Sequence, residues 1–573
     1  MTDTQPETPQ LADAVSDRRR PEMIADPPTH PLQILKQVGP GLIIAANIVG
    51  SGELIMTTKT GAEAGISLLW LILVGCVVKV FVQLELGRFV ISHGETTLSS
   101  LNRVPGPRLG RINWVVLFWG FMMFTTVGQL GGIVGGVGQA LAQTLPFTGD
   151  VQDAVRIPSE QNIRQLADYE LLRTGMAPVN DPKFAETLSG LTESQRQQRV
   201  RQMEWVARDL AALGDRGVLF LDLARRGEVL AASDGTSLVS PTTRDDKIWV
   251  VIVGLITATV LLFGRYRLIE RFSVLLVVSF TFITIGNVVA LQSTKDYSVS
   301  TAQLMEGLSF GFPDLPNALV TAFATFGIIG VGATELISYP YWCLEKGYAR
   351  STGPREQTEA WLRRAIGWFR VMKYDAFASM VIYTCATAAF YIMGVAVLHA
   401  EGRNPEGGRM VSTLAQSYVP IFGSYARWLF LSGAIAVLYS TYLVANASNA
   451  RMISDFIGVV GFSSDDAESR QRKRLVTCLS VALPLACVAA YLLFPNPVIL
   501  VAIAGVTQAL MLPVLGFSSL YFRFQETDHR LRPAWLWDAC LMTSCTALFL
   551  TGCWGLYNTA PELAERIAAI WNL

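Results

Sequence analysis

Long apolar segments constrain the fold of this chain more than any other feature of its sequence. The runs 113–143, 475–494 and 498–519 contain no charged residue. About 20 apolar residues in a helix span the hydrocarbon core of a bilayer, where backbone polar groups must bond to one another. With 51% hydrophobic and 16% charged residues, the chain is also too apolar for an ordinary soluble protein. The sequence therefore predicts an all-α integral membrane protein.

We count eleven such segments, and the basic residues of their connections fall on one side of the membrane. Clusters at 18–20, 265–271 and 470–474 mark cytoplasmic segments under the positive-inside rule. We therefore expect the N-terminus in the cytoplasm and the C-terminus outside the inner (plasma) membrane of a bacterium. The predicted spans are 39–60, 66–90, 113–143, 247–264, 270–292, 318–341, 375–398, 425–447, 475–494, 498–519 and 534–557.

Composition divides the chain into six parts. Residues 1–30 form a polar tail without the apolar core of a signal peptide, and we expect this cytoplasmic tail to be disordered. Residues 147–246 form a soluble insertion outside the membrane, with a predicted helix near 192–213 and a hairpin over 217–233. A partner-binding cap, a lid and a neutral insertion all remain open for it, and its partner is unknown. The remaining parts are spans 1–3 in 31–146, spans 4–5 in 247–292, spans 6–11 in 293–557, and an outer tail in 558–573.

A seven-residue motif occurs twice inside these spans. Val49–Ile55 (VGSGELI) and Val331–Ile337 (VGATELI) agree at five positions. Each copy holds a glycine, which weakens a helix, and a glutamate, whose charge costs about 3 kcal/mol or more at the bilayer centre. Two broken apolar helices in corresponding halves indicate the binding site of a transporter. Chance similarity, with each glutamate paired to a structural lysine, remains open.

The two motifs lie in spans one and six, which run in opposite directions. If each span begins a unit of five helices, the chain is a five-plus-five inverted repeat with one extra helix. The predicted fold class is therefore an eleven-helix membrane protein with broken helices 1 and 6 and one soluble insertion.

The motifs supply oxygen ligands. They comprise the carboxylates of Glu53 and Glu335, backbone carbonyls freed near Gly50 and Val331, and the hydroxyls of Ser51 and Thr334. Sites made only of oxygen suit hard cations such as Mg²⁺, Ca²⁺ or Mn²⁺. Two carboxylates and one divalent ion also balance in charge, which offsets the cost of burying them. The sequence therefore predicts a divalent metal cation transporter, with Mg²⁺ or Mn²⁺ favoured as the ion.

Other polar residues of the spans surround the two motifs. Gln508 and Thr507 are candidates for a second shell, although a polar core explains them equally well. Lys79 and Lys59 are candidates for a counter-charge to the glutamates, and snorkelling at a span end is the alternative, favoured for Lys59. Without metal, two nearby carboxylates would share protons, so proton exchange for metal is a further expectation.

Several function classes find no support in the sequence. The eight cysteines lie in or beside apolar segments without CxxC spacing, so neither a disulfide framework nor a zinc site is indicated. We find no nucleophile–base pair and no phosphate loop, so we expect neither an enzyme nor a cofactor. The net charge is zero, which gives no reason to expect binding to nucleic acid. Membrane lipid, the metal cation and protons are the expected partners.

Several short motifs resemble the Nramp (natural-resistance-associated macrophage protein) family of divalent metal transporters. The resemblance covers most of both membrane blocks and none of 147–246, and it implies a leucine-transporter-like fold with alternating access. The residues that carry it are Gly39-Pro40-Gly41, Gly61-Ala62, Gly65, Leu68-Leu69-Trp70, Tyr266-Arg267-Leu268-Ile269-Glu270, Gly327-Ile328-Ile329-Gly330, Leu398-His399-Ala400 and Leu510-Met511-Leu512-Pro513.

The chain departs from this family at the positions that matter most for the metal. The family signature Asp-Pro-Gly-Asn falls on Gly50-Ser51-Gly52-Glu53, and Met-Pro-His falls on Thr334-Glu335-Leu336. The acidic residues that the family carries on helix three fall on Thr126 and Gln129. The resemblance therefore implies a divergent branch, without the family's soft metal ligands or its acidic proton route.

Two other functions remain open. An amino-acid or other small-solute symporter of the same fold could pair the substrate's ammonium group with Glu53 or Glu335. A membrane sensor without transport could signal through the 147–246 insertion. Uptake that chelators do not affect would favour the symporter, and a phenotype that depends on the insertion alone would favour the sensor.

Overall fold

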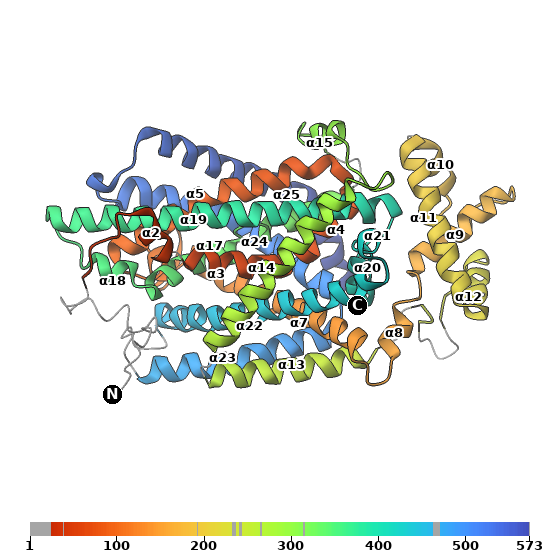
Figure 1. The fold of residues 1–573 in the computed structure, drawn as a ribbon, viewed down its shortest axis with the longest axis horizontal. Coiled ribbons are helices and arrows are strands. Elements are labelled where there is room, and N and C mark those ends of the chain that lie inside the picture. Colours follow the sequence, from red (N-terminus) through yellow and green to blue (C-terminus); the bar gives the residue numbers. More distant parts are fainter. Residues whose placement is uncertain are drawn as a thin grey trace.

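The computed structural model describes residues 24–37, 39–191, 193–231, 237–239, 243–263, 266–312, 316–461 and 470–571. Most of the tail predicted to be disordered, residues 1–23, lies outside the described residues. The long helices lie side by side along one direction, and the helices of the insertion gather at one end of the bundle (Figure 1). This arrangement agrees with membrane helices that carry a soluble insertion on one side.

The helices before the insertion surround the first motif. The chain turns after α4 at Gly65, whose φ of +61° favours glycine, and continues into α5. These elements are α2 (Pro31–Gln37), α3 (Pro40–Ile48), the π-helix η3 (Val49–Thr57), α4 (Thr58–Ala64), η4 (Gly65–Leu68), α5 (Leu69–His93), α6 (Thr97–Leu101), the paired strands β1 (Arg108–Leu109) and β2 (Ile112–Asn113), and α7 (Trp114–Thr144).

The helices after the insertion complete the bundle. They are α13 (Asp245–Leu262), α14 (Tyr266–Leu291), α15 (Thr301–Gly307), α16 (Pro316–Ile328), α17 (Ala333–Glu345), α18 (Tyr348–Thr352), α19 (Glu359–Met393), η5 (Gly394–His399), η6 (Gly407–Arg409), α20 (Met410–Gln416), α21 (Val419–Phe422), η7 (Gly423–Tyr425), α22 (Ala426–Val460), α23 (Arg470–Leu493), α24 (Pro497–Tyr521), η8 (Phe522–Glu526), η9 (His529–Leu531) and α25 (Trp535–Trp571). The last helix continues through most of the predicted outer tail at 558–573.

Eight helical stretches of the described residues are long and apolar enough to cross a membrane. Helices occupy each of the predicted segments, but the stretch Gly52–His93 contains two of them, and α13 and α14 are not among the eight. The structure therefore confirms a helical membrane protein, and the count of eleven spans stays a prediction.

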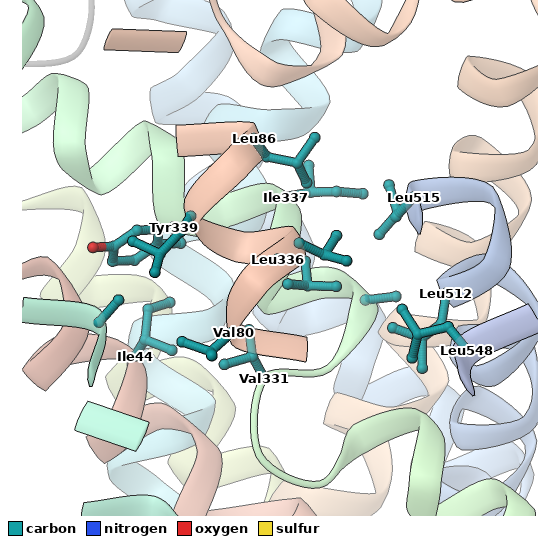
Figure 2. Packing of buried hydrophobic residues seen from close by; sticks show 14 of the residues in the cluster. Ile44, Val80, Leu86, Val331, Leu336, Ile337, Tyr339, Leu512, Leu515 and Leu548 are labelled. Carbon is teal, nitrogen blue, oxygen red and sulfur yellow. The ribbon is translucent and has the colours of Figure 1, made fainter. Parts of the chain in front are cut away.

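Apolar side chains fill the space around α17. Leu336 and Ile337 of this helix belong to the same buried cluster as Val80 of α5 and Leu512 of α24 (Figure 2). Such interdigitation gives dispersion contacts, which matter within a membrane because lipid is as apolar as the side chains. The packing fixes α17 against α5 and α24, the two helices that bring lysine and glutamine to the second motif.

The insertion is helical and has its own apolar core. Its helices are α8 (Asp150–Ala154), α9 (Glu160–Arg173), α10 (Phe184–Gly190), α11 (Glu193–Ala212) and α12 (Asp215–Arg225). Helix α11 confirms the helix predicted near 192–213. The hairpin predicted over 217–233 is wrong, because Gly217, Phe220 and Ala224 are buried at helical spacing in α12. The apolar residues of this segment fit both the period of a helix and that of a strand, so their spacing does not distinguish the two.

The two ends of the insertion are tied together. The carboxylate of Asp245 accepts hydrogen bonds from the backbone N–H groups of Phe147, Thr148 and Gly149 at 2.9–3.0 Å. The carboxylate of Asp150 accepts in turn from the N–H groups of Arg244 and Asp245. Because these bonds join residues almost 100 positions apart, the insertion leaves and rejoins the bundle at nearly the same point.

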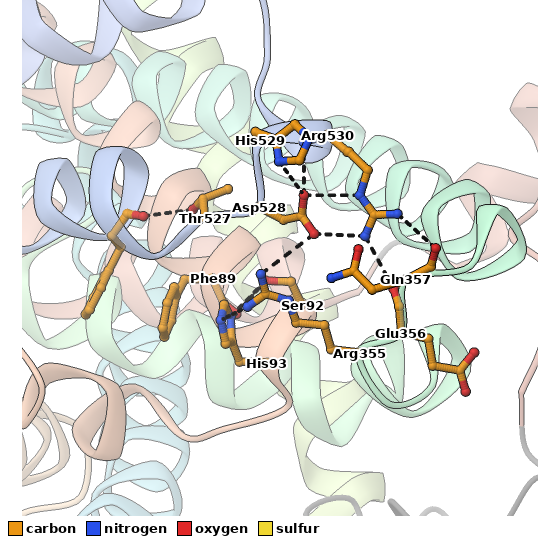
Figure 3. Close-up of polar contacts among 11 residues, drawn as sticks. Phe89, Ser92, His93, Arg355, Glu356, Gln357, Thr527, Asp528, His529 and Arg530 are labelled. Atoms are coloured by element: carbon orange, nitrogen blue, oxygen red, sulfur yellow. Dashed lines mark hydrogen bonds and ion pairs between the residues drawn. The ribbon is translucent and has the colours of Figure 1, made fainter.

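A polar cluster joins several helix ends at the opposite end of the bundle. Asp528 accepts a hydrogen bond from Arg530 at 2.9 Å and lies 3.7 Å from Arg355 (Figure 3). Arg355 in turn contacts the Nε2 atom of His93, at the end of α5, at 3.0 Å. Arg530 donates to the backbone carbonyl of Gln357 before α19. The cluster therefore ties the end of α5, the start of α19 and the α24–α25 connection to one another.

Candidate functional site

The first motif keeps a helical backbone. Residues Val49–Thr57 form a π-helix that continues directly from α3 into α4, so the predicted break in helix 1 is not present. The hydroxyls of Thr57 and Thr58 donate to the carbonyls of Gly52 and Glu53, each five residues earlier. The wider π-turn accommodates the glycines, and the helix continues through them unbroken. Such turns are frequent at functional sites.

The second motif lies at a true interruption. Helix α16 ends at Ile328 and α17 begins at Ala333. Gly330 between them has φ of +56°, and a side-chain carbon built on it would lie 3.1 Å from the Cα atom of Cys76. Only glycine adopts this conformation readily and leaves room for α5. The connection 329–332 is therefore irregular backbone inside the bundle, which is tolerated where neighbouring groups satisfy it.

Two buried charges hold one peptide group of this connection. The ammonium of Lys79 donates to the carbonyl of Ile329 at 2.8 Å and also to the carbonyl of Phe326. On the other side of the same peptide, the N–H of Gly330 donates to Glu53 Oε1 at 3.2 Å. Both charged side chains are fully buried. The lysine therefore satisfies the free carbonyls at the end of α16, where a cation is favourable.

Glu335 lies on the other flank of the connection, in the first turn of α17. A side-chain carbon built on Gly332 would lie 2.6 Å from Glu335 Oε2 and 2.9 Å from Gln508 Oε1, so both oxygens face this glycine. Gln508 accepts from the N–H of Thr334 and donates to Gln129 on α7 at 2.8 Å. Glu335 is partly buried, and the N-terminus of a helix favours its negative charge.

Two oxygen atoms of the site are buried without a hydrogen-bond partner among the described residues. They are Glu53 Oε2 and Thr334 Oγ1. An unpartnered carboxylate oxygen inside a bundle is costly, so this atom has a reason to bind a cation or a proton. The side chain of Val331 packs among Ile44 and Val80, so it faces the apolar core and supplies no ligand (Figure 2).

The remaining predicted site residues have other roles or are not described. A side-chain carbon on Gly50 would lie 2.1 Å from Thr441 Oγ1, so this glycine lets η3 approach α22 closely. The Thr507 hydroxyl donates to Ile503 in its own helix. The side chain of Ser51 lies outside the described residues.

For Lys59 the structure agrees with the favoured alternative, a lysine that reaches the end of its span, and not with a counter-charge to Glu53. Its ammonium lies 2.7 Å from Glu63 and 3.6 Å from Glu406, and it donates to Asn404. Six residues of helix separate it from Glu53 by about 9 Å along the axis, so it reaches the end of the bundle instead. Lys79 is the lysine that the fold brings to the site.

Sequence reasoning missed two residues of α19 that the structure brings to the first helix. The hydroxyl of Thr387 donates to Glu53 Oε1 at 2.9 Å. The carboxylate of Asp375 accepts from the N–H groups of Gly39 and Gly41 and from the hydroxyl of Tyr339. An acid within an apolar segment was the available signal for Asp375. Its two glycine partners lie more than 330 positions earlier, which no local pattern reveals.

No group of three or more histidine, cysteine, aspartate or glutamate residues gathers as a metal site in the part of the chain that the structure describes. Any cation bound beside Glu53 must therefore also use hydroxyl, amide or backbone oxygens. The site consists of two acids and one lysine around a single helix interruption.

The structure has a charged site inside a bundle of apolar helices, an arrangement typical of membrane transporters. A sequence model described as natural resistance-associated macrophage protein-like (Nramp) matches residues 187–527, more than half of the chain. The chain belongs to the Nramp family. The match includes the second motif and begins within the insertion, but it leaves out the first motif. No curated protein matches the chain.

Solved transporter structures also resemble the chain. A mutant of the Eremococcus coleocola manganese transporter is 13% identical, with 95% of this chain and 90% of that chain covered and a TM-score of 0.46. MhsT in complex with L-phenylalanine is 14% identical, with 89% and 98% covered and a TM-score of 0.47. Mhp1 in an inward-facing conformation is 12% identical, with 95% and 94% covered and a TM-score of 0.35. At these values the similarities do not bear on the substrate.

Proposed function

We propose that this protein carries a divalent metal cation, Mg²⁺ or Mn²⁺, across the membrane by alternating access. The observation that carries the proposal is Glu53 Oε2, a buried carboxylate oxygen without a partner among the described residues, beside the interruption at 329–332. Membership of the Nramp family supports metal as the substrate. We place the site in an eleven-span, leucine-transporter-like inverted repeat, with the N-terminus in the cytoplasm and the insertion outside.

The ligands of the proposed site are hard oxygens. Glu53 and Glu335 approach the connection from two sides, and we add Thr334 Oγ1 and the Val331 carbonyl, from the same motif, as further ligands. Such donors suit Mg²⁺ and Mn²⁺, whereas softer metals prefer sulfur or nitrogen. This donor set differs from the family signatures that the chain lacks, so we expect a preference for hard ions.

Lys79 adds one positive charge to the two negative charges of the proposed site. With two carboxylates and one lysine, the empty site carries one net negative charge when all three are ionised. We propose that the ammonium of Lys79 releases the α16 carbonyls when metal neutralises Glu53, and returns when metal leaves. Protonation of either glutamate would neutralise the empty site, which makes exchange of protons for metal part of the proposal.

Uptake into proteoliposomes tests the proposal. A panel of Mg²⁺, Mn²⁺ and Ca²⁺, with and without a pH gradient, should show uptake of Mg²⁺ or Mn²⁺ by the wild type. Glu53→Gln and Glu335→Gln should each reduce uptake to the background of empty liposomes. Glu306→Gln, an exposed glutamate on α15, serves as the matched control and should transport normally. Full transport by Glu53→Gln would refute the site.

A small zwitterion is the second candidate substrate. Glu53 and Lys79 present opposite charges on the two sides of one peptide group, and an amino acid carries the complementary pair. Uptake of a labelled amino acid in the presence of a metal chelator, lost in both Glu53→Gln and Lys79→Met, would favour this candidate over the metal.

A further inference from the structure

A cavity of about 740 Å³ lies between the insertion and the end of the helix bundle. Helices α9 and α11 of the insertion line one side of it, and the connection before α20 lines the other. Known sites for small molecules have volumes of this order. The cavity lies away from Glu53 and Glu335, so the proposed transport function does not account for it.

Positive charge predominates in this cavity. Five arginines and three carboxylates line it, which leaves an excess of two positive charges. The carboxylates of this cavity already form ion pairs. Glu401 lies 2.8 Å from Arg403, and Glu406 lies 3.6 Å from Lys59. Asp209 also lies 3.9 Å from Arg403. Five arginines therefore share three acids, and none of these acids forms an ion pair with Arg199.

Arg199 and Arg409 line the cavity without a close ion pair, although Glu406 and Asp209 attract Arg409 from farther away. Arg199 of α11 donates to the amide oxygens of Gln165 and Gln202, and Arg409 donates to the carbonyl of Ile157. Neither forms an ion pair with any residue that the structure describes. Burial lowers the pKa of both guanidinium groups below the ordinary value. Both remain cationic at neutral pH, so each favours an anion in the cavity.

A buried amide adds an independent indication of a ligand. Gln143, near the end of α7, lines the cavity and is only 3% exposed. Its Nε2 group is buried and has no acceptor among the described residues. A donor left without an acceptor is costly, and a bound oxygen would satisfy it.

We propose that the cavity binds a small oxyanion with at least two negative charges, held by Arg199, Arg409 and Gln143. Guanidinium groups bind carboxylates and phosphates through paired, charge-assisted hydrogen bonds, and the amide supplies a third donor. The site is separate from the transport site and lies between the insertion and the membrane helices. This gives the insertion a function of its own.

Calorimetric titration of the purified full-length protein in a non-ionic detergent tests this site. Inorganic phosphate and citrate are the two probes, one for phosphate and one for carboxylate chemistry, in a buffer free of other multivalent anions. We expect saturable binding of at least one probe. Arg199→Gln and Arg409→Gln should each weaken it at least about tenfold, as expected for loss of a charged hydrogen bond. Arg196→Gln, on the same helix but paired with Glu193, is the control and should bind normally.

One further variant is expected to bind the anion more tightly, a result that unfolding of the variant cannot produce. Asp209→Asn removes a negative charge from the cavity, so it should bind the anion several-fold more tightly than wild type. The proposal is overturned if neither probe binds below about 10 mM. It is also overturned if folded Arg199→Gln binds like wild type, or if Asp209→Asn does not tighten binding.

Discussion

Lys79 is the residue on which the charge balance of the proposed site depends. Its ammonium satisfies two carbonyls at the end of α16, so Lys79→Met leaves both buried acceptors unpaired. We expect the variant to lose about 1–3 kcal/mol of stability, measured by thermal unfolding in detergent. We also expect metal to bind more tightly, because a competing tethered cation is removed. Lys295→Met, at an exposed position, is the control.

Uptake measured over a range of metal concentrations separates this role from a structural one. A lower half-saturating concentration in Lys79→Met supports competition between lysine and metal. An unchanged half-saturating concentration, together with the stability loss, would show that Lys79 only supports the end of α16.

A second single residue, Gly330, determines the backbone conformation of the interruption. A side chain there meets both a positive φ of +56° and the Cα atom of Cys76 at 3.1 Å. The backbone conformation alone costs an L-residue about 1–2 kcal/mol, so Gly330→Ala should lower the unfolding temperature and transport activity together. Gly286→Ala is the matched control, because Gly286 lies within α14 with open space around it. That control should be neutral or stabilising, and an equal effect of both substitutions would contradict the argument.

At the scale of elements, the polar cluster around Asp528 links three helix ends and should make stability depend on pH. The hydrogen bond from Arg530 and the nearby positive charges hold the pKa of Asp528 well below its usual range (Figure 3). Because the folded pKa lies below the unfolded value of about 3.9, this stabilisation is complete above that pH. It is lost as the pH falls from there towards the folded pKa.

Asp528→Asn should therefore lower the unfolding temperature at pH 7, and its difference from wild type should shrink below about pH 4. Thermal unfolding of both proteins between pH 7 and pH 3 measures this. Asp296→Asn, an exposed aspartate in the connection before α15, should show no such trend. A difference that stays constant with pH would mean that the ion pair does not contribute.

At the scale of the whole molecule, we expect the insertion to be separable from the membrane helices. Its ends are tied by Asp245 and Asp150, and its core is made of its own helices. We expect a chain with residues 151–243 replaced by a short glycine–serine linker to remain monodisperse in size-exclusion chromatography and to transport metal. The same protein should no longer bind phosphate or citrate. Loss of transport in a folded deletion variant would instead make the insertion part of the transport machinery.

Much of the architecture could be predicted from local patterns. Apolar runs such as 113–143 and 498–519 predict α7 and α24 because a buried helix in lipid must satisfy its own backbone. The repeated motif pointed to the interruption after Ile328, and Glu53 of its first copy contacts that interruption in the structure. The first motif was predicted to break its helix in the same way. It forms a π-helix instead, and the hydroxyls of Thr57 and Thr58 add hydrogen bonds to its carbonyls.

What the sequence determined by itself was the class of protein: apolar periodicity and buried acids require a helical membrane protein with a polar site. Only the tertiary structure decided which distant groups meet, because partners hundreds of positions apart leave no local pattern. It assigned Lys79 to the carbonyls of α16 and Lys59 to the far end of the bundle, although both are lysines in apolar segments. It also closed the insertion over an arginine-lined cavity, since packing between elements depends on shape and charge in space and not on order along the chain.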